Sequence, residues 1–130
     1  MEKKRHAKSY ARENAFKSLY SYSISKDKEA IEKRSDLEKE RKDELANQMA
    51  YNTISHLEEI DKIIKKNLVR WSIHNLNIAD LSILRLAIYE LEYEQTPAGI
   101  VINESLNLVD RYSDPKSKKF IHKVLDNVTK

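Results

Sequence analysis

The chain has 130 residues and a mass of 15.3 kDa, enough for one domain with a hydrophobic core that needs no metal ion or disulfide. It has no cysteine, which excludes disulfide frameworks and thiolate metal sites, and no apolar run approaches the length of a membrane span. One glycine, two prolines and 35% charged residues predict long helices joined by few turns. The missing cysteines and the missing long apolar run predict a soluble, cytoplasmic protein without a targeting segment.

Positive charge is concentrated at the N-terminus, in a basic arm that we define as residues 1–9. The first twelve residues carry five basic side chains against one acid, whereas the whole chain has a formal net charge of only +3. These basic residues are Lys3, Lys4, Arg5, Lys8 and Arg12. A basic segment on an otherwise balanced domain is typical of proteins that bind a polyanion, with nucleic acid as the leading candidate. The alternative is a terminus that only improves solubility.

The first half of the chain predicts two principal helices. Residues 7–25 place Ala11, Ala15, Phe16, Leu19 and Tyr20 at spacings of three and four, which indicates an amphipathic helix. The charged stretch 26–44 is interpreted as a loosely packed short helix and linker. A long helix is expected over 38–69 and should end near 71–77, where two asparagines and Ser72 favour local backbone bonding. Trp71 is interpreted as a core residue, with base stacking as the alternative.

The second half begins with the most apolar segment, NIADLSILRLAIYELEYE at 77–94, which we expect to be the central helix. Thr96 and Pro97 predict the N-cap and first position of the next helix. Ser113 or Asp114, just before a proline, predicts the start of the last helix. No segment alternates with period two over the length of a strand. We therefore expect an all-α bundle of about six or seven helices, forming a single domain over residues 1–130.

The residues that enzymes use are absent or wrongly spaced. Gly99 is the only glycine, which excludes glycine-rich phosphate loops and dinucleotide-binding motifs. The four histidines, His6, His56, His74 and His122, lack the spacing of metal-binding pairs. We expect no enzymatic activity, no metal, no cofactor and no small-molecule substrate.

Three charged features of the folded domain can be anticipated. Arg85 lies inside the most apolar helix, and a buried cation must be paired, so we predict an internal ion pair with Glu104. Asp80 opens the same helix, where a carboxylate interacts favourably with the helix dipole, worth about 0.3–1 kcal/mol. Residues 115–125 contain four lysines and no acid, a second basic patch that can join the first.

Four ordered blocks of sequence carry a resemblance to a known family. The first is Ala11-Arg12-Glu13 with Ala15, Leu19 and Tyr20, and the second is DLSILRLAIYEL from Asp80 to Leu91. The third is Pro97 followed by INES at 102–105, Leu108 and Tyr112, and the fourth is KFI at 119–121 with VLD at 124–126. Over nearly its full length, the chain resembles the NusB family of bacterial transcription antitermination factors.

This resemblance implies an RNA-binding adaptor that pairs with NusE, a small-subunit ribosomal protein. Together they would bind boxA, a single-stranded element in nascent ribosomal RNA, and help to load a termination-resistant elongation complex. The implied RNA face comprises the basic N-terminal residues and the start of the last helix, here Lys116, Lys118, Lys119 and Phe120. The implied NusE-binding residues are Tyr20, Asp80 and Tyr112, with helix capping as another role for Asp80. For Phe120, core packing is the alternative to base stacking.

The chain departs from the family pattern at two places, and other functions stay open. Ser9 and Tyr10 stand where members often carry arginines, and His122 and Lys123 stand where Asn-Gly is usual. One alternative is a NusB-like helical domain of the kind attached to ribosomal RNA methyltransferases. A second is a protein-interaction bundle that has lost RNA binding. A DNA-binding helix-turn-helix regulator is a weaker option, because no short glycine-containing turn joins two helices.

Overall fold

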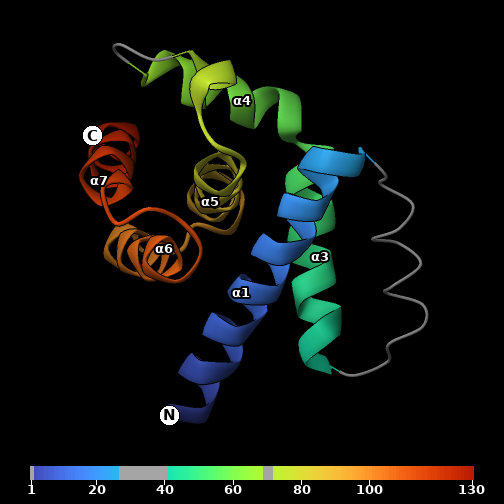
Figure 1. The fold of residues 1–130 in the computed structure, drawn as a ribbon. Helices are drawn as coiled ribbons and strands as arrows, with labels where there is room; N and C mark the ends of the chain where they lie inside the picture. Colours follow the sequence, from blue (N-terminus) through green and yellow to red (C-terminus); the bar gives the residue numbers. More distant parts are fainter. Residues whose placement is uncertain (1, 27–40, 69–71) are drawn as a thin grey trace. The chain divides into compact units, whose positions relative to one another are not determined.

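The computed structural model describes the backbone of residues 2–26, 41–68 and 72–130 (Figure 1). It describes the side chains of residues 8–26, 44–68 and 72–130. Six α-helices lie in the described ranges, which contain no strand, so the prediction of an all-α fold is confirmed. By its internal contacts the chain divides into two compact units, Met1–Ser55 and His56–Lys130. The single domain expected for residues 1–130 stays a prediction about how these units assemble.

The first unit pairs α1 (Glu2–Ser25) with α3 (Arg41–Ser55), and the two helices lie side by side (Figure 1). The buried residues of α1 include Ala11, Ala15, Phe16 and Leu19, as its spacing predicted. The helix begins at Glu2, however, so the basic arm forms the first turns of α1 and does not precede it. Lysine and arginine are good helix formers, and no glycine or proline interrupts this stretch.

The long helix predicted over 38–69 is two helices, α3 and α4 (Leu57–Lys66), with a break at His56. The backbone at His56 has φ −110° and ψ 19°, outside the helical region. Just before the break, the hydroxyl groups of Thr53 and Ser55 donate to the carbonyls of Met49 and Tyr51, at 2.7 and 2.9 Å. Such bonds to the preceding turn bend helices. The interpretation of Trp71 as a core residue lies outside the described residues.

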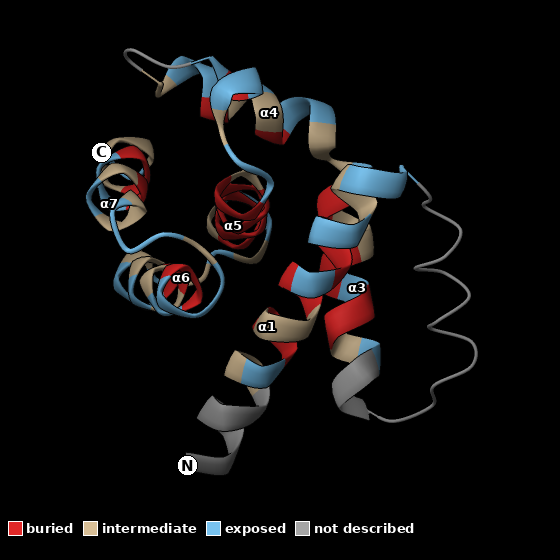
Figure 2. Ribbon diagram, in the orientation of Figure 1, coloured by how far each residue is buried: buried red, intermediate tan, exposed pale blue. Residues whose placement is uncertain are grey.

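In the second unit, α5 (Ile78–Tyr89) is the central helix and packs against α4, α6 (Ala98–Tyr112) and α7 (Ser117–Val128). Every residue from Ala79 to Tyr89 except Leu81 is buried, and Figure 2 shows α5 red along its length. A helix that is buried all round needs neighbours on several sides, which agrees with the central position that its wide apolar stripe predicted. A 3₁₀ turn (Ile73–Asn75) precedes α5, and a π-helical segment (Glu90–Glu94) follows it.

Two helix starts differ from the sequence prediction by one or more residues. Pro97 occupies the N-cap position of α6, while the hydroxyl group of Thr96 donates to Oε1 of Glu90 at 3.3 Å. The last helix, α7, begins at Ser117 and follows a turn in which the Asp114 carboxylate accepts from the backbone N–H of Lys116 at 2.9 Å. None of the helices in the described part of the chain has the length and apolarity needed to cross a membrane.

Candidate nucleic-acid interface

The N-terminal basic residues differ in their exposure. Lys3, Lys4 and Arg5 belong to the first turns of α1, and their side chains lie outside the described residues. Lys8 is half-buried and Tyr10 is exposed. Arg12 is only 5% exposed, and a guanidinium this buried is not presented to a polyanion. Its burial separates Arg12 from the exposed basic residues, and its assignment as an RNA contact stays a prediction.

The second basic patch lies in the turn before α7 and in its first turns. Lys116 and Lys119 are exposed, and Phe120 is half-buried. Lys118 forms an ion pair, because its Nζ lies 2.6 Å from Oδ1 of Asp110 on α6. The four residues predicted from this segment are thus not equivalent as candidate RNA contacts.

One buried carboxylate holds this patch in place. Oδ1 of Asp80 accepts from the hydroxyl group of Ser113, at the end of α6, and Oδ2 accepts from that of Ser117, the first residue of α7, both at 2.7 Å. The side-chain amide of Asn77 donates to the same Oδ2 at 3.2 Å. We call Asp80, Ser113 and Ser117 the Asp80 clasp. It ties the start of α5 to the turn between α6 and α7.

The clasp changes the interpretation of Asp80. The N-cap of α5 is Asn77, whose Oδ1 accepts from the backbone N–H of Asp80 at 2.7 Å. Asp80 itself is 5% exposed, and both of its carboxylate oxygens are occupied. Asp80 therefore has an internal role, and its place in the first turn of the helix agrees with the expected dipole interaction. Its assignment as a partner contact stays a prediction.

The other two residues assigned to the partner surface are accessible. Tyr20 on α1 is 38% exposed and Tyr112 at the end of α6 is 36% exposed. The ring of Phe16 lies near Tyr20 on the same helix, with the centroids 6.1 Å apart. Exposed tyrosines are frequent anchors of protein interfaces, so both assignments stay predictions.

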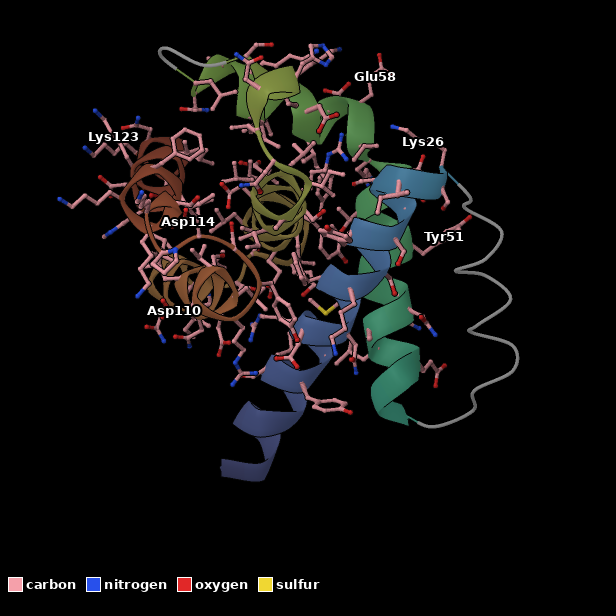
Figure 3. All side chains as sticks on the ribbon, viewed as in Figure 1. Lys26, Tyr51, Glu58, Asp110, Asp114 and Lys123 are labelled. Carbon is pink, nitrogen blue, oxygen red and sulfur yellow. The ribbon has the colours of Figure 1, made fainter. Side chains whose placement is uncertain are left out.

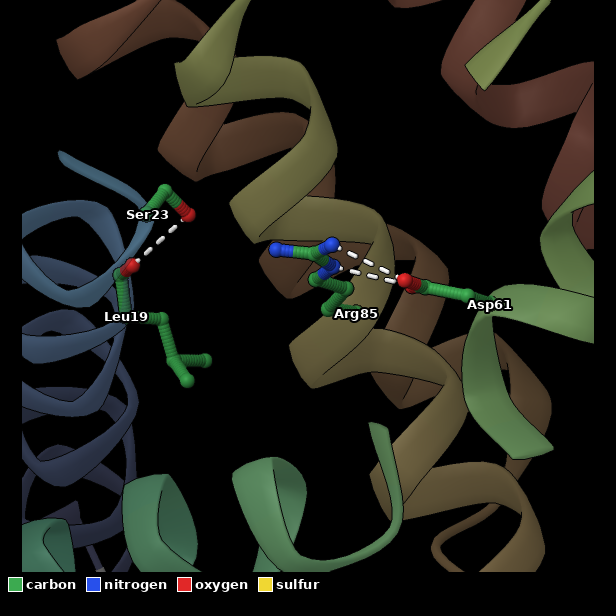
Figure 4. A network of polar contacts seen from close by, with 4 residues as sticks. All are labelled: Leu19, Ser23, Asp61 and Arg85. Atoms are coloured by element: carbon green, nitrogen blue, oxygen red, sulfur yellow. Dashed lines mark hydrogen bonds and ion pairs between the residues drawn. The ribbon is translucent and has the colours of Figure 1, made fainter. Parts of the chain in front are cut away.

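Arg85 forms an ion pair with an acid that the sequence analysis did not name. Nε and Nη2 of Arg85 donate to the two carboxylate oxygens of Asp61 on α4, each at 2.9 Å (Figure 4). The predicted Glu104 lies on α6 and is half-buried. Arg85 is thus paired inside the fold, with Asp61 as a partner, because α4 packs against α5 and presents this carboxylate to it. The predicted pair with Glu104 stays a prediction.

Three residues of these networks were missed in the sequence: Asp61, Ser113 and Ser117. A signal for Asp61 existed, since it directly follows the buried Ile60 in an apolar stripe. No pattern in the sequence links the two serines to an acid more than thirty residues earlier. Within the described residues, no group of three or more histidines, aspartates and glutamates is arranged to hold a metal ion.

Comparison with known proteins decides the family. A family model described as the NusB family matches residues 9–130. The chain belongs to the NusB family. It is 36% identical over 121 residues to the transcription antitermination protein NusB of Bacillus subtilis, and the match covers 91% of each chain. The NusB proteins of Bacillus cereus that it matches at 35% identity carry the same description, transcription antitermination protein.

Solved NusB structures have the same fold. NusB of T. maritima superposes with a TM-score of 0.81 at 28% identity, covering 92% of this chain and 88% of the other. A chain in the crystal structure of the antitermination factors NusB and NusE in complex with dsRNA gives a TM-score of 0.79 at 30% identity, covering 95% and 96%. The NusB-like fold expected from the four sequence blocks is therefore confirmed.

Proposed function

We propose that this chain is an RNA-binding transcription antitermination factor that acts together with the ribosomal protein NusE. The RNA is single-stranded and boxA-like, in nascent ribosomal RNA, and the complex helps to load a termination-resistant elongation complex. The observation that supports RNA binding together with NusE is the chain's similarity, over 95% of its length, to a protein solved in a complex of NusB and NusE with dsRNA. The choice of a single-stranded, boxA-like RNA rests on the family resemblance of the sequence. The role is that of an adaptor, without catalysis or cofactor.

The proposed RNA contacts combine charge with stacking. Proteins hold single strands through basic side chains along the backbone and aromatic rings on which bases stack. Lys116 and Lys119 supply exposed charge at the start of α7, and Phe120 supplies a half-buried ring beside them. On α1, Lys4, Arg5 and Lys8 supply further charge near the exposed Tyr10.

The proposed NusE contacts are the exposed rings of Tyr20 and Tyr112. Tyrosines contribute large, rigid contact areas at a small cost in conformational entropy. A titration of NusE against single alanine variants of the two tyrosines tests this assignment. Unchanged affinity in both folded variants would place the partner elsewhere.

Replacing Lys4, Arg5 and Lys8 together with glutamine is expected to weaken RNA binding and leave the fold intact, because glutamine is also a good helix former. Each phosphate of a single strand that a basic side chain no longer neutralises lowers the slope of log K against log salt by about 0.7. The triple variant should therefore have a slope up to about 2 units shallower if all three residues bind phosphate. The measurement is a binding titration at several salt concentrations, with boxA-like and scrambled single strands and with or without NusE.

A charge-matched control for this experiment is the triple variant Lys62→Gln, Lys65→Gln and Lys66→Gln on α4, where all three lysines are exposed. It lowers the net charge equally but changes no proposed RNA-binding residue. An equal decrease in RNA affinity in the α1 and α4 triple variants would show that only the net charge of the chain matters, not the position of the basic residues. An unchanged affinity in the α1 triple would favour the alternative of a protein-interaction bundle without its own RNA binding.

A further inference from the structure

Three lysines of the last helix and its preceding turn share one exposed face. Lys116, Lys119 and Lys123 are separated by three and four residues, which places them in one row, and we call them the α7 stripe. At 1.5 Å per residue, the row extends about 10 Å along the helix. All three side chains are exposed, and Figure 3 shows Lys123 on the side of α7 that faces away from α5.

The charges of the α7 stripe are not neutralised within the fold. Among the residues that the structure describes, no acidic side chain forms an ion pair with Lys116, Lys119 or Lys123. The row ends one turn later at Asp126, which pairs with Lys130 at 3.4 Å. A row of cations on a regular helix presents charge at fixed intervals to a polyanion.

Lys118 lies on a different side of the helix. It is offset from Lys116 by two residues, about 200° around the axis, so it does not share the face of the stripe. Its ammonium group is held 2.6 Å from the Asp110 carboxylate of α6, and both side chains are partly exposed. An RNA strand that stays on the face of the stripe therefore does not contact Lys118, whose charge is already offset by Asp110.

An aromatic ring lies beside the stripe. Phe120 is four residues after Lys116 and three before Lys123, and it is half-buried. The Asp80 clasp holds Ser117, so the first turn of α7 is anchored to the buried core. Fixed cations around a partly accessible ring provide the pairing of phosphate contact and base stacking that single-stranded RNA requires.

We propose that the α7 stripe follows the phosphate backbone of the bound single-stranded RNA, which makes Lys123 an RNA contact and leaves Lys118 outside the RNA surface. This inference rests on the proposed RNA-binding function and extends it by a full helical turn beyond the start of α7. Charge complementarity identifies the occupant, because the stretch from 115 to 125 has four lysines and no acid.

The test compares three single variants of the full-length chain: Lys119→Gln, Lys123→Gln and Lys118→Gln. Each is titrated with a boxA-like RNA oligonucleotide at several salt concentrations, with circular dichroism as the check of folding. Lys119→Gln and Lys123→Gln should each make the slope of log K against log salt shallower by about 0.7. Between 1 M and 0.1 M salt, the affinity of each variant should therefore rise about fivefold less than that of the unsubstituted chain. Lys118→Gln, the matched control from the same helix turn, should leave the slope within error of the unsubstituted chain.

The outcomes separate this inference from the proposed function. If Lys119→Gln lowers the slope and Lys123→Gln does not, the stripe is overturned while RNA binding stands. If Lys118→Gln lowers the slope as much as Lys123→Gln, the selective use of one helix face is overturned. If the unsubstituted chain fails to bind RNA at low salt, both with and without NusE, the proposed function itself fails and the stripe with it.

Discussion

Replacing Asp61 with alanine should lower the free energy of unfolding by about 3 kcal/mol, the lower end of the range for breaking a buried ion pair. The Arg85 side chain is 9% exposed and would be deprived of the carboxylate that accepts two of its hydrogen bonds. The effect is not larger because the Asp61 side chain is 21% exposed, so water can solvate part of the vacated site. Thermal unfolding should shift down by about 10 °C.

Chemical denaturation measures this change, and the same helix offers a control. Glu59→Ala removes an acid of α4 whose pair with Lys62 is 63% exposed on both sides and 3.5 Å long. This variant should change stability by less than about 0.5 kcal/mol. A double-mutant cycle with Arg85→Met isolates the coupling between the two side chains. A decrease in Asp61→Ala as small as that in Glu59→Ala would show that the pair does not stabilise α4 on α5.

Replacing Asp80 with alanine should lower the free energy of unfolding by about 3 kcal/mol, since it removes two short hydrogen bonds to a charged acceptor. It also leaves the hydroxyl groups of Ser113 and Ser117 without this acceptor in a partly buried place. The start of α7 should loosen most, because Ser117 is its first residue. Hydrogen exchange of the amides at the start of α7 measures that local effect beside the global decrease in stability.

Two variants distinguish the clasp from a general effect of charge. The double variant Ser113→Ala and Ser117→Ala should reproduce most of the faster exchange at α7 while keeping the Asp80 charge. Asp110→Asn removes an acid that is 47% exposed and should cost less than about 1 kcal/mol. Unchanged exchange at α7 in both Asp80→Ala and the double serine variant would contradict the clasp.

The sequence by itself determined the fold class, the central helix and the family, because these depend on signals that are local or repeated many times. Almost no glycine or proline interrupts the apolar periodicity, so most helices can be placed before any contact is known. The wide apolar stripe of residues 78–91 predicted a central helix, and the structure packs α4, α6 and α7 against it. The four sequence blocks identified the family because their order and separations are jointly specific.

Only the tertiary structure decided which side chains meet. Arg85 needed an acid, but the pairing with Asp61 depends on how α4 is rotated against α5, which no local pattern encodes. The same holds for Asp80, whose two serine partners come from a turn more than thirty residues later. The pairing of Lys118 with Asp110 likewise depends on how α7 meets α6. Local propensity places a helix, whereas the register between packed helices determines which charges are buried, paired or left for a ligand.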